Sequence, residues 1–138
     1  MRILFVCTGN AARSQMAEGW ARHLAPAVAV ESAGTRPAGL SHHAVAAMAE
    51  AGADISVQRS KLLSATAWRD ADIAVTLCGS AREECVAQPW SPATQREHWP
   101  IADPVAAPAG DDPLAPFRTA RDEIRARVEA LLATVENK

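Results

Sequence analysis

One stretch near the start of the chain decides the fold: Ile3-Leu4-Phe5-Val6-Cys7-Thr8-Gly9-Asn10-Ala11-Ala12-Arg13-Ser14. Its first four residues are apolar, as in a buried β-strand. Beyond it, Met16, Trp20 and Leu24 recur at the spacing of a helix that buries one face. The stretch therefore predicts a short strand, a glycine-containing loop and a helix that begins at Ser14.

Strand-like and helix-like segments alternate along the rest of the chain. We predict strands over 2–6, 27–31, 72–77 and 97–99, and helical segments over 14–24, 41–52, 64–68, 84–87 and from 112 to 135. This alternation predicts an α/β fold, with a parallel sheet covered by helices on both faces. In such sheets ligands bind beyond the carboxyl ends of the strands. Cys7 and Cys78 each follow the end of a predicted strand, so we expect their loops to meet at one mouth.

The composition is typical of an ordinary globular protein. The chain has 138 residues, 49% hydrophobic and 22% charged, and we expect one domain over 1–138. The net charge of -2 gives no long-range attraction to nucleic acid or to an anionic membrane. No apolar run has the length of a membrane span, and no signal-peptide pattern is present, so we expect a cytoplasmic protein. There, cysteines are more typical of catalysis or redox chemistry than of structural disulfides.

The loop between the predicted strand and helix has the residues of an oxyanion site. At such a junction backbone N–H groups converge at the positive end of a helix and bind a tetrahedral oxyanion. Cys7 adds a nucleophile and Arg13 adds a bidentate clamp, while the hydroxyls of Ser14 and Thr8 are expected to donate to the thiolate. The alternative is a buried packing cysteine followed by a helix-start arginine. The expected substrate-binding residues are Thr8, Gly9, Asn10, Ala11, Ala12, Arg13 and Ser14.

Several motifs of the chain resemble those of one known family. They are Val6-Cys7-Thr8-Gly9-Asn10, Arg13-Ser14-Gln15-Met16-Ala17-Glu18-Gly19, Ser32-Ala33-Gly34, Val75-Thr76-Leu77-Cys78, Glu97-His98-Trp99, Asp103-Pro104 and Arg121-Asp122-Glu123-Ile124. Together they resemble the thioredoxin-coupled arsenate reductases, which are built on the low-molecular-weight protein tyrosine phosphatase fold. The likeness covers nearly the whole chain. It implies a single-domain, three-layer α/β/α architecture with a four-stranded parallel sheet and flavodoxin-like winding.

The resemblance implies a role for each of the three cysteines. Cys7 attacks arsenate, Cys78 attacks the adduct so that arsenite leaves and a disulfide forms, and Cys85 moves that disulfide outward. Thioredoxin is the implied partner that reduces it. The segment 79–84 has to rearrange for this transfer, with Gly79 as a hinge. The alternative is that Cys78 and Cys85 are inert packing cysteines.

A carboxylic acid is expected to protonate the oxygen that leaves during the attack of the thiolate. The sequence offers two aspartates in the same context, Asp103-Pro104 and Asp112-Pro113. An aspartate before a proline is also a common turn former, so the dipeptide alone does not separate them. The resemblance favours Asp103 as the general acid.

Some relatives hold a potassium ion beneath the loop. The resemblance assigns this site to Asn10, Glu18 and Ser32, but Lys61 stands at the aligned acidic position, and its ammonium group competes with a cation. The alternative is a hydrogen-bond network that shapes the loop. Because the cysteines form no C-x-x-C pair and the histidines do not cluster, we expect no other metal and no tightly bound cofactor.

The leading interpretation is arsenate reduction for detoxification, by a monomer whose loop also accommodates phosphate or sulfate. A phosphatase that forms a Cys7 phosphoenzyme needs only one cysteine, but the chain has no tyrosine to contact an aromatic substrate. A reductase coupled to a small thiol is another alternative, and it leaves Cys78 and Cys85 dispensable. An anion-sensing or redox-sensing binding module, without turnover, is the non-enzymatic alternative.

Overall fold

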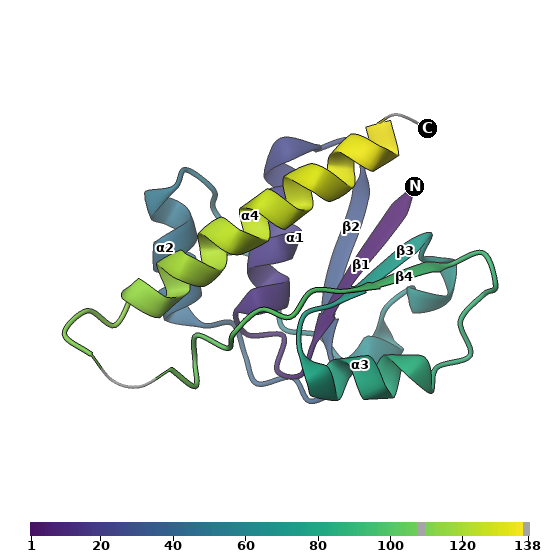
Figure 1. The fold of residues 1–138 in the computed structure, drawn as a ribbon, viewed down its shortest axis with the longest axis horizontal. Coiled ribbons are helices and arrows are strands. Elements are labelled where there is room, and N and C mark those ends of the chain that lie inside the picture. The colour runs from purple at the N-terminus through teal and green to yellow at the C-terminus, as the bar shows by residue number, and fades with distance from the viewer. Residues whose placement is uncertain (108–109, 137–138) are drawn as a thin grey trace.

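The computed structural model describes residues 1–107 and 110–136. Its sheet contains β1 (Arg2–Cys7), β2 (Ala29–Gly34), β3 (Ile73–Thr76) and β4 (Gln95–His98), and every neighbouring pair is parallel. The helices are α1 (Arg13–Leu24), α2 (His42–Glu50), α3 (Gly79–Val86) and α4 (Ala115–Glu136), with short 3-10 helices at Leu63–Ala65 and Trp68–Asp70. The strand order is β2-β1-β3-β4 (Figure 1), which confirms the predicted four-stranded parallel sheet.

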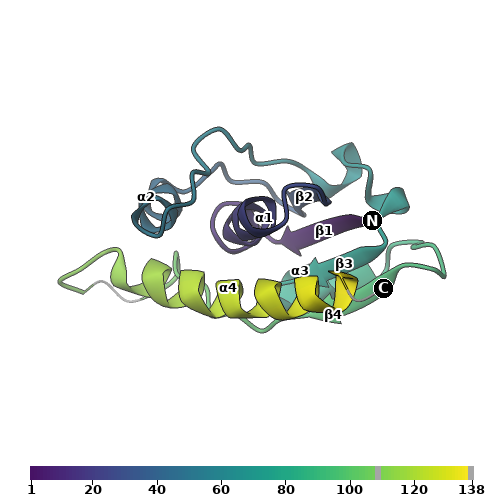
Figure 2. The same cartoon turned by 90° about the horizontal axis from the view of Figure 1, so that it is seen from above.

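Helices cover both faces of the sheet, so the predicted three layers are confirmed. Figure 2 shows α1 and α2 together on one side of β1. α1, α2 and α4 pack together on one face, while α3 packs on the other face against β1 and β3. β1 is buried throughout its apolar part because its side chains alternate between two cores. Ile3 and Phe5 belong to the core with α1 and α4, and Leu4 and Val6 belong to the core with α3.

The two central strands bring the predicted site residues to one place. β1 and β3 are neighbours, but α1 follows β1 onto one face of the sheet and α3 follows β3 onto the other. Their carboxyl ends therefore flank the switch point at which open parallel sheets bind ligands. Cys7 is the last residue of β1, and Cys78 is the N-cap residue of α3, just beyond β3.

The helix after β3 is longer than the turn predicted over 84–87. It runs from Gly79 to Val86, and among its described side chains only those of Ala81 and Cys85 are buried. Two small side chains give a weak helical pattern, so periodicity alone detects only the end of this helix. Cys85 therefore lies within a regular helix in this structure.

Several other elements differ from their predicted bounds. The short helix predicted over 64–68 is instead two 3-10 helices, Leu63–Ala65 and Trp68–Asp70, and β4 begins at Gln95 rather than at residue 97. β2 runs to Gly34 rather than to residue 31, because its last residues pair with the end of β1. α4 begins at Ala115 rather than at Asp112, whose carboxylate accepts a hydrogen bond from the backbone N–H of Leu114 at 2.9 Å in the turn before the helix. Neither α4 nor any other helix in the described part of the chain is long and apolar enough to cross a membrane.

Candidate active site

The loop between β1 and α1 is held from outside by the segment that follows β2. Four carbonyl oxygens of the loop accept hydrogen bonds from backbone N–H groups of that segment. The donor and acceptor pairs are Thr35 to Cys7 (3.3 Å), Arg36 to Thr8 (2.8 Å), Ala38 to Gly9 (2.8 Å) and Ser41 to Ala11 (2.9 Å). In a trans peptide the N–H group points away from the carbonyl oxygen. The N–H groups that follow these carbonyls therefore face the inside of the loop, where they form a concavity suited to an oxyanion.

Asn10 fixes the shape of this loop. Its φ of 47° lies in the left-handed region, which asparagine tolerates better than most residues. Its buried side-chain amide donates to Ser14 Oγ at 2.8 Å and to Ser32 Oγ at 3.0 Å. Its Oδ1 atom accepts from the backbone N–H of Lys61 at 2.8 Å and from Gln15 Nε2 at 3.1 Å. Four hydrogen bonds thus hold the strained residue at the centre of the loop.

Gly34 explains why the loop approaches β2 so closely. A Cβ atom at this position would lie 2.6 Å from the carbonyl oxygen of Thr8 and 2.9 Å from Asn10 Cβ and N. These distances are shorter than any ordinary contact, and two of the three atoms belong to backbone. Any larger side chain at position 34 therefore displaces the loop. The motif Ser32-Ala33-Gly34 has this steric reason in addition to its resemblance to the family.

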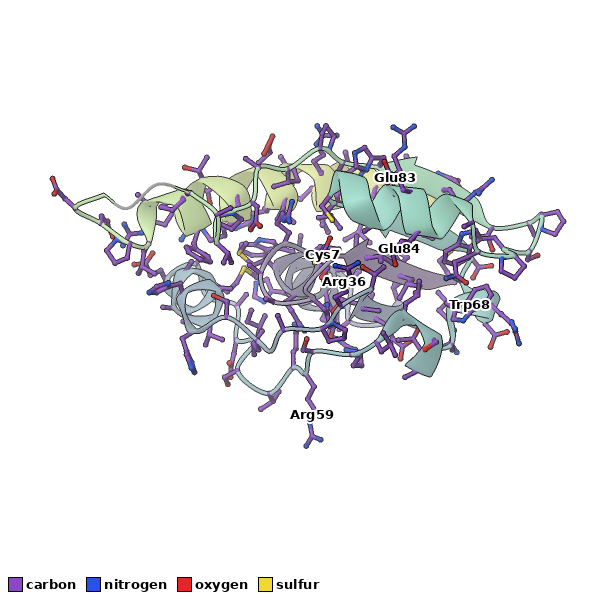
Figure 3. All side chains as sticks on the ribbon, turned by 90° about the horizontal axis from the view of Figure 1, so that it is seen from below. Cys7, Arg36, Arg59, Trp68, Glu83 and Glu84 are labelled. Atoms are coloured by element: carbon purple, nitrogen blue, oxygen red, sulfur yellow. The ribbon has the colours of Figure 1, made fainter. Side chains whose placement is uncertain are left out.

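Cys7 lies at the base of the concavity, between α3 and the segment that carries Arg36 (Figure 3). Its side chain is buried, and its Sγ atom lies 2.8 Å from Ser14 Oγ. The backbone N–H of Asn10 donates to the same sulfur at 3.2 Å. These two contacts fix the sulfur at the base of the loop. The position of Cys7 is therefore that of a nucleophile.

Arg13 links the loop to the candidate general acid. Its Nη1 atom donates to the carbonyl oxygens of Leu77 at 3.2 Å and Ile101 at 3.0 Å, while Nη2 lies 3.4 Å from Asp103 Oδ2. Its side chain is largely buried, with 11% exposed, so the guanidinium is fixed at the mouth of the loop. Of the two Asp-Pro dipeptides, the structure brings Asp103 to this arginine, whereas Asp112 pairs with Arg118 at the start of α4.

Cys78 lies beside the loop and contacts Thr8. Its Sγ atom is 3.0 Å from Thr8 Oγ1, although the two residues are far apart in the sequence. Of the two hydroxyls expected at the Cys7 thiolate, that of Ser14 lies there, and that of Thr8 contacts Cys78 instead. The residue next to Cys7 thus positions a second thiol at the mouth of the site.

Cys85 lies apart from this group. It is buried in α3, and burial raises the pKa of its thiol to about 11, with Cys78 and Glu84 acting in the same direction. Cys78 and Cys85 are seven positions apart, a separation of about 10 Å along a helix axis. A disulfide needs Cα atoms within about 7 Å. All three cysteines are free thiols here, and Cys78 and Cys85 can pair only after α3 unwinds.

The residues of the candidate cation site already have protein partners. Glu18 Oε1 accepts from Ser32 Oγ at 2.6 Å and lies 3.7 Å from Lys61 Nζ. Glu18 Oε2 pairs with Arg22 Nε at 2.9 Å. With Asn10 Oδ1 also engaged, the donor set does not fit a potassium ion. Elsewhere in the described residues, no group of three or more His, Cys, Asp or Glu side chains could hold a metal.

A buried glutamine network also supports the loop, and it was missed in the sequence. Gln15 Nε2 donates to the carbonyl oxygens of Asn10 at 3.1 Å and Arg59 at 2.9 Å. Gln58 in turn donates to Gln15 Oε1 at 2.8 Å. Gln15 stands next to Met16 in the predicted helix and is fully buried, but nothing in the local sequence marks Gln58 as its partner.

Comparison with known proteins agrees with this geometry. The profile of the low molecular weight phosphotyrosine protein phosphatases matches residues 2–138. The arsenate reductase of Bacillus licheniformis is 45% identical over 136 residues, which cover 97% of this chain and 96% of that protein. A solved arsenate reductase in the phosphate-binding state has a TM-score of 0.79 at 36% identity and covers 96% of this chain and 97% of its own. Another, in the oxidized state, has a TM-score of 0.80 at 34% identity and covers 97% and 98%. The chain therefore belongs to the low molecular weight phosphotyrosine protein phosphatase family, and within it to the arsenate reductases.

Proposed function

We propose that this arsenate reductase works through three thiols in sequence and is regenerated by a thioredoxin. The observation that carries the proposal is the contact between Thr8 Oγ1 and Cys78 Sγ, which holds a second thiol beside the nucleophile loop. A phosphatase has no use for a thiol there. The solved relatives in phosphate-binding and oxidized states support an oxyanion site coupled to a redox change.

The first step is the attack of Cys7 on arsenic. Arsenate is held by the loop N–H groups and by Arg13, which stabilise its negative charge. The thiolate forms a sulfur–arsenic bond, and one arsenic-bound oxygen leaves as water after taking a proton from Asp103. The short distance between Arg13 Nη2 and Asp103 Oδ2 supports this assignment, since it keeps the carboxyl group at the mouth of the site.

The second step reduces arsenic. The Cys78 thiolate attacks the sulfur of Cys7, so that a disulfide forms and the sulfur–arsenic bond breaks. The electron pair of that bond stays on arsenic, which leaves as arsenite. Arsenic thus gains two electrons, and the two sulfurs lose two electrons as they form the disulfide. Thiolate attack on a bonded sulfur is the ordinary chemistry of exchange.

The third step moves the disulfide away from the loop. The Cys85 thiolate attacks Cys78, which releases Cys7 as a thiolate and leaves a Cys78–Cys85 disulfide. Because Cys85 is buried with a pKa near 11, α3 has to open before this attack. A dithiol protein such as thioredoxin then reduces the exposed disulfide, and a cytoplasmic location suits such a reductant.

A coupled assay tests the proposal. Arsenate-dependent oxidation of NADPH is measured with thioredoxin and thioredoxin reductase, for the wild type and for Cys7→Ser, Cys78→Ser and Cys85→Ser. We expect multiple turnovers only in the wild type. Undiminished turnover of Cys85→Ser contradicts the relay. If a small thiol supports turnover of every protein except Cys7→Ser, the enzyme is regenerated by that small thiol and not by a thioredoxin.

Phosphomonoester hydrolysis is the second candidate activity. Cys7, Arg13 and Asp103 form a site that is complete for phosphoryl transfer without the other two thiols. The absence of tyrosine from the chain favours small esters over phosphotyrosine. Hydrolysis of para-nitrophenyl phosphate by Cys78→Ser at the wild-type rate would identify it as a side activity of the loop.

We also propose that Lys61 replaces a potassium ion beneath the loop. Its ammonium group lies near Glu18, and Arg22 neutralises the other carboxylate oxygen. Equal turnover in potassium and sodium chloride at the same ionic strength is expected. A specific requirement for potassium contradicts the replacement.

A further inference from the structure

Trp90 holds the end of the helix that carries Cys85. It lies in the loop after α3, and its indole Nε1 donates a hydrogen bond to the carbonyl oxygen of Cys85 at 2.5 Å. The same oxygen accepts from the backbone N–H of Gln88 at 3.1 Å and from the C-cap residue Ala87. The carbonyl oxygen of Cys85 thus accepts the hydrogen bonds that hold the segment after α3 against the end of the helix.

α3 depends on such contacts because its own residues stabilise it weakly. It has eight residues, and isolated helices shorter than about 12 residues are marginal in water. Its N-cap residue, Cys78, makes no capping hydrogen bond through its side chain to any described residue. Of its described side chains only Ala81 and Cys85 are buried, and both are small. Contacts at the ends of α3 therefore decide how readily it opens.

Trp90 is itself fixed to the core of the protein. Its ring meets Trp68 edge to face, with centroids 5.2 Å apart and an interplanar angle of 85°. Trp68 is buried in the same cluster as Leu4 and Val6 of β1, and it lies near one end of α3 in Figure 3. Trp68, which does not belong to α3, therefore holds the Trp90 indole in place beside the carbonyl oxygen of Cys85.

We infer that Trp90 is a positioning residue for the relay, one that keeps Cys85 within the resting helix until disulfide transfer. This inference rests on the proposed three-thiol function. The hydrogen bond from Trp90 is present in the helical dithiol form, and it breaks when the backbone of Cys85 moves to meet Cys78. It therefore favours the dithiol over the disulfide and raises the reduction potential of the Cys78–Cys85 pair.

Alkylation of Cys85 tests the inference without arsenate. Iodoacetamide labelling of each cysteine is followed by peptide mass spectrometry for wild type, Trp90→Phe and Trp68→Phe. Trp90→Phe keeps an aromatic ring against Trp68 and removes the N–H donor, so we expect labelling of Cys85 to be about five-fold faster, the effect of one hydrogen bond. Cys7 labelling in the same sample is the control for folding and should not change.

The matched variant separates the hydrogen bond from the packing. Trp68→Phe keeps an aromatic ring against Trp90 and leaves the Trp90 donor in place, so we expect Cys85 labelling close to that of the wild type. Equal labelling in wild type and Trp90→Phe overturns the inference, as does equal acceleration in both variants. Acceleration of Cys7 and Cys85 together in Trp90→Phe also overturns it, because it reports general loosening of the fold.

The reduction potential measures directly whether Trp90 favours the dithiol over the disulfide, and Trp68→Phe serves as the packing control here too. Equilibration of the Cys78–Cys85 pair in dithiothreitol buffers should give Trp90→Phe a potential about 20 mV lower, the equivalent of a five-fold change. An unchanged potential contradicts the inference. If arsenate turnover does not need Cys85, the proposed function fails while the labelling result still decides the role of Trp90 in holding α3.

Discussion

Thr8 Oγ1 lies 3.0 Å from Cys78 Sγ, so the residue that follows the nucleophile in the chain contacts the second thiol. This contact joins the two strand ends at the switch point of the sheet. It places Cys78 on the same side of the loop as the expected adduct, and it restricts the motion of the thiol before attack. The positioning of Cys78 therefore depends on a side chain of the oxyanion loop itself.

Thr8→Val should separate the two thiol steps. It keeps the backbone N–H groups of the loop but removes the hydroxyl that contacts Cys78. We expect the arsenate KM to stay near the wild-type value and kcat to fall about five- to ten-fold, as for the loss of one hydrogen bond. Hydrolysis of para-nitrophenyl phosphate should be unaffected. Thr8→Ser is the control that keeps the contact, and a rate as low as that of the valine variant would show that the hydroxyl is not the cause.

Asp103→Asn should slow the attack on the oxyanion. The amide cannot deliver a proton to the leaving oxygen, and loss of a general acid costs about 100-fold in kcat. Single-turnover formation of the Cys7 adduct measures this step directly. Asp112→Asn is the matched control, because Asp112 also precedes a proline but pairs with Arg118. Its rate should equal that of the wild type. A similar loss in both variants contradicts the assignment of Asp103.

Gly34→Ala should damage the oxyanion loop. Its methyl group meets the Thr8 carbonyl oxygen at 2.6 Å, and backbone there cannot move without displacing the N–H groups of the site. We expect phosphate binding, measured by calorimetry, to weaken at least ten-fold, about 1.4 kcal/mol. Gly110→Ala, whose methyl group meets nothing within 4 Å, should bind like the wild type. Normal phosphate binding in Gly34→Ala would mean that the loop tolerates displacement.

Alkaline pH should open α3. Burial raises the pKa of Cys85 from 9.0 to about 11, so the unfolded or opened form loses its proton first. The stabilisation by the buried thiol is complete below pH 9 and is lost as the pH rises to 11. Amide hydrogen exchange in α3, corrected for its intrinsic pH dependence, should accelerate over this range. Cys85→Ala removes the titrating group, and an identical pH profile in that variant would assign the opening to another residue.

The first part of the fold was predictable because its signals are local. Four apolar residues before the loop and the helical spacing of Met16, Trp20 and Leu24 belong to single elements, and each occupies the predicted place. Cys7 and Cys78 were predicted to meet because each follows a strand of a parallel sheet. That argument needs only the strand ends, and the contact of Cys78 with Thr8 agrees with it.

The remaining features depend on contacts between distant residues. The full length of α3 has little signal in its own sequence, since Ala81 and Cys85 are its only buried side chains among those described. The hydrogen bond between Gln58 and Gln15 joins a loop to the start of α1. Trp90 has a role only because α3 ends beside its indole. Such partners follow from the packing of the sheet and not from any local pattern.

The disulfide formed after a single turnover tests the three-thiol relay most directly. The fully reduced protein is mixed with arsenate without any reductant, quenched by acid and alkylation, and mapped by peptide mass spectrometry alongside an arsenite assay. The relay predicts one arsenite per chain, a Cys78–Cys85 disulfide and a free Cys7 thiol. Arsenite release with Cys78 and Cys85 both still free would contradict it.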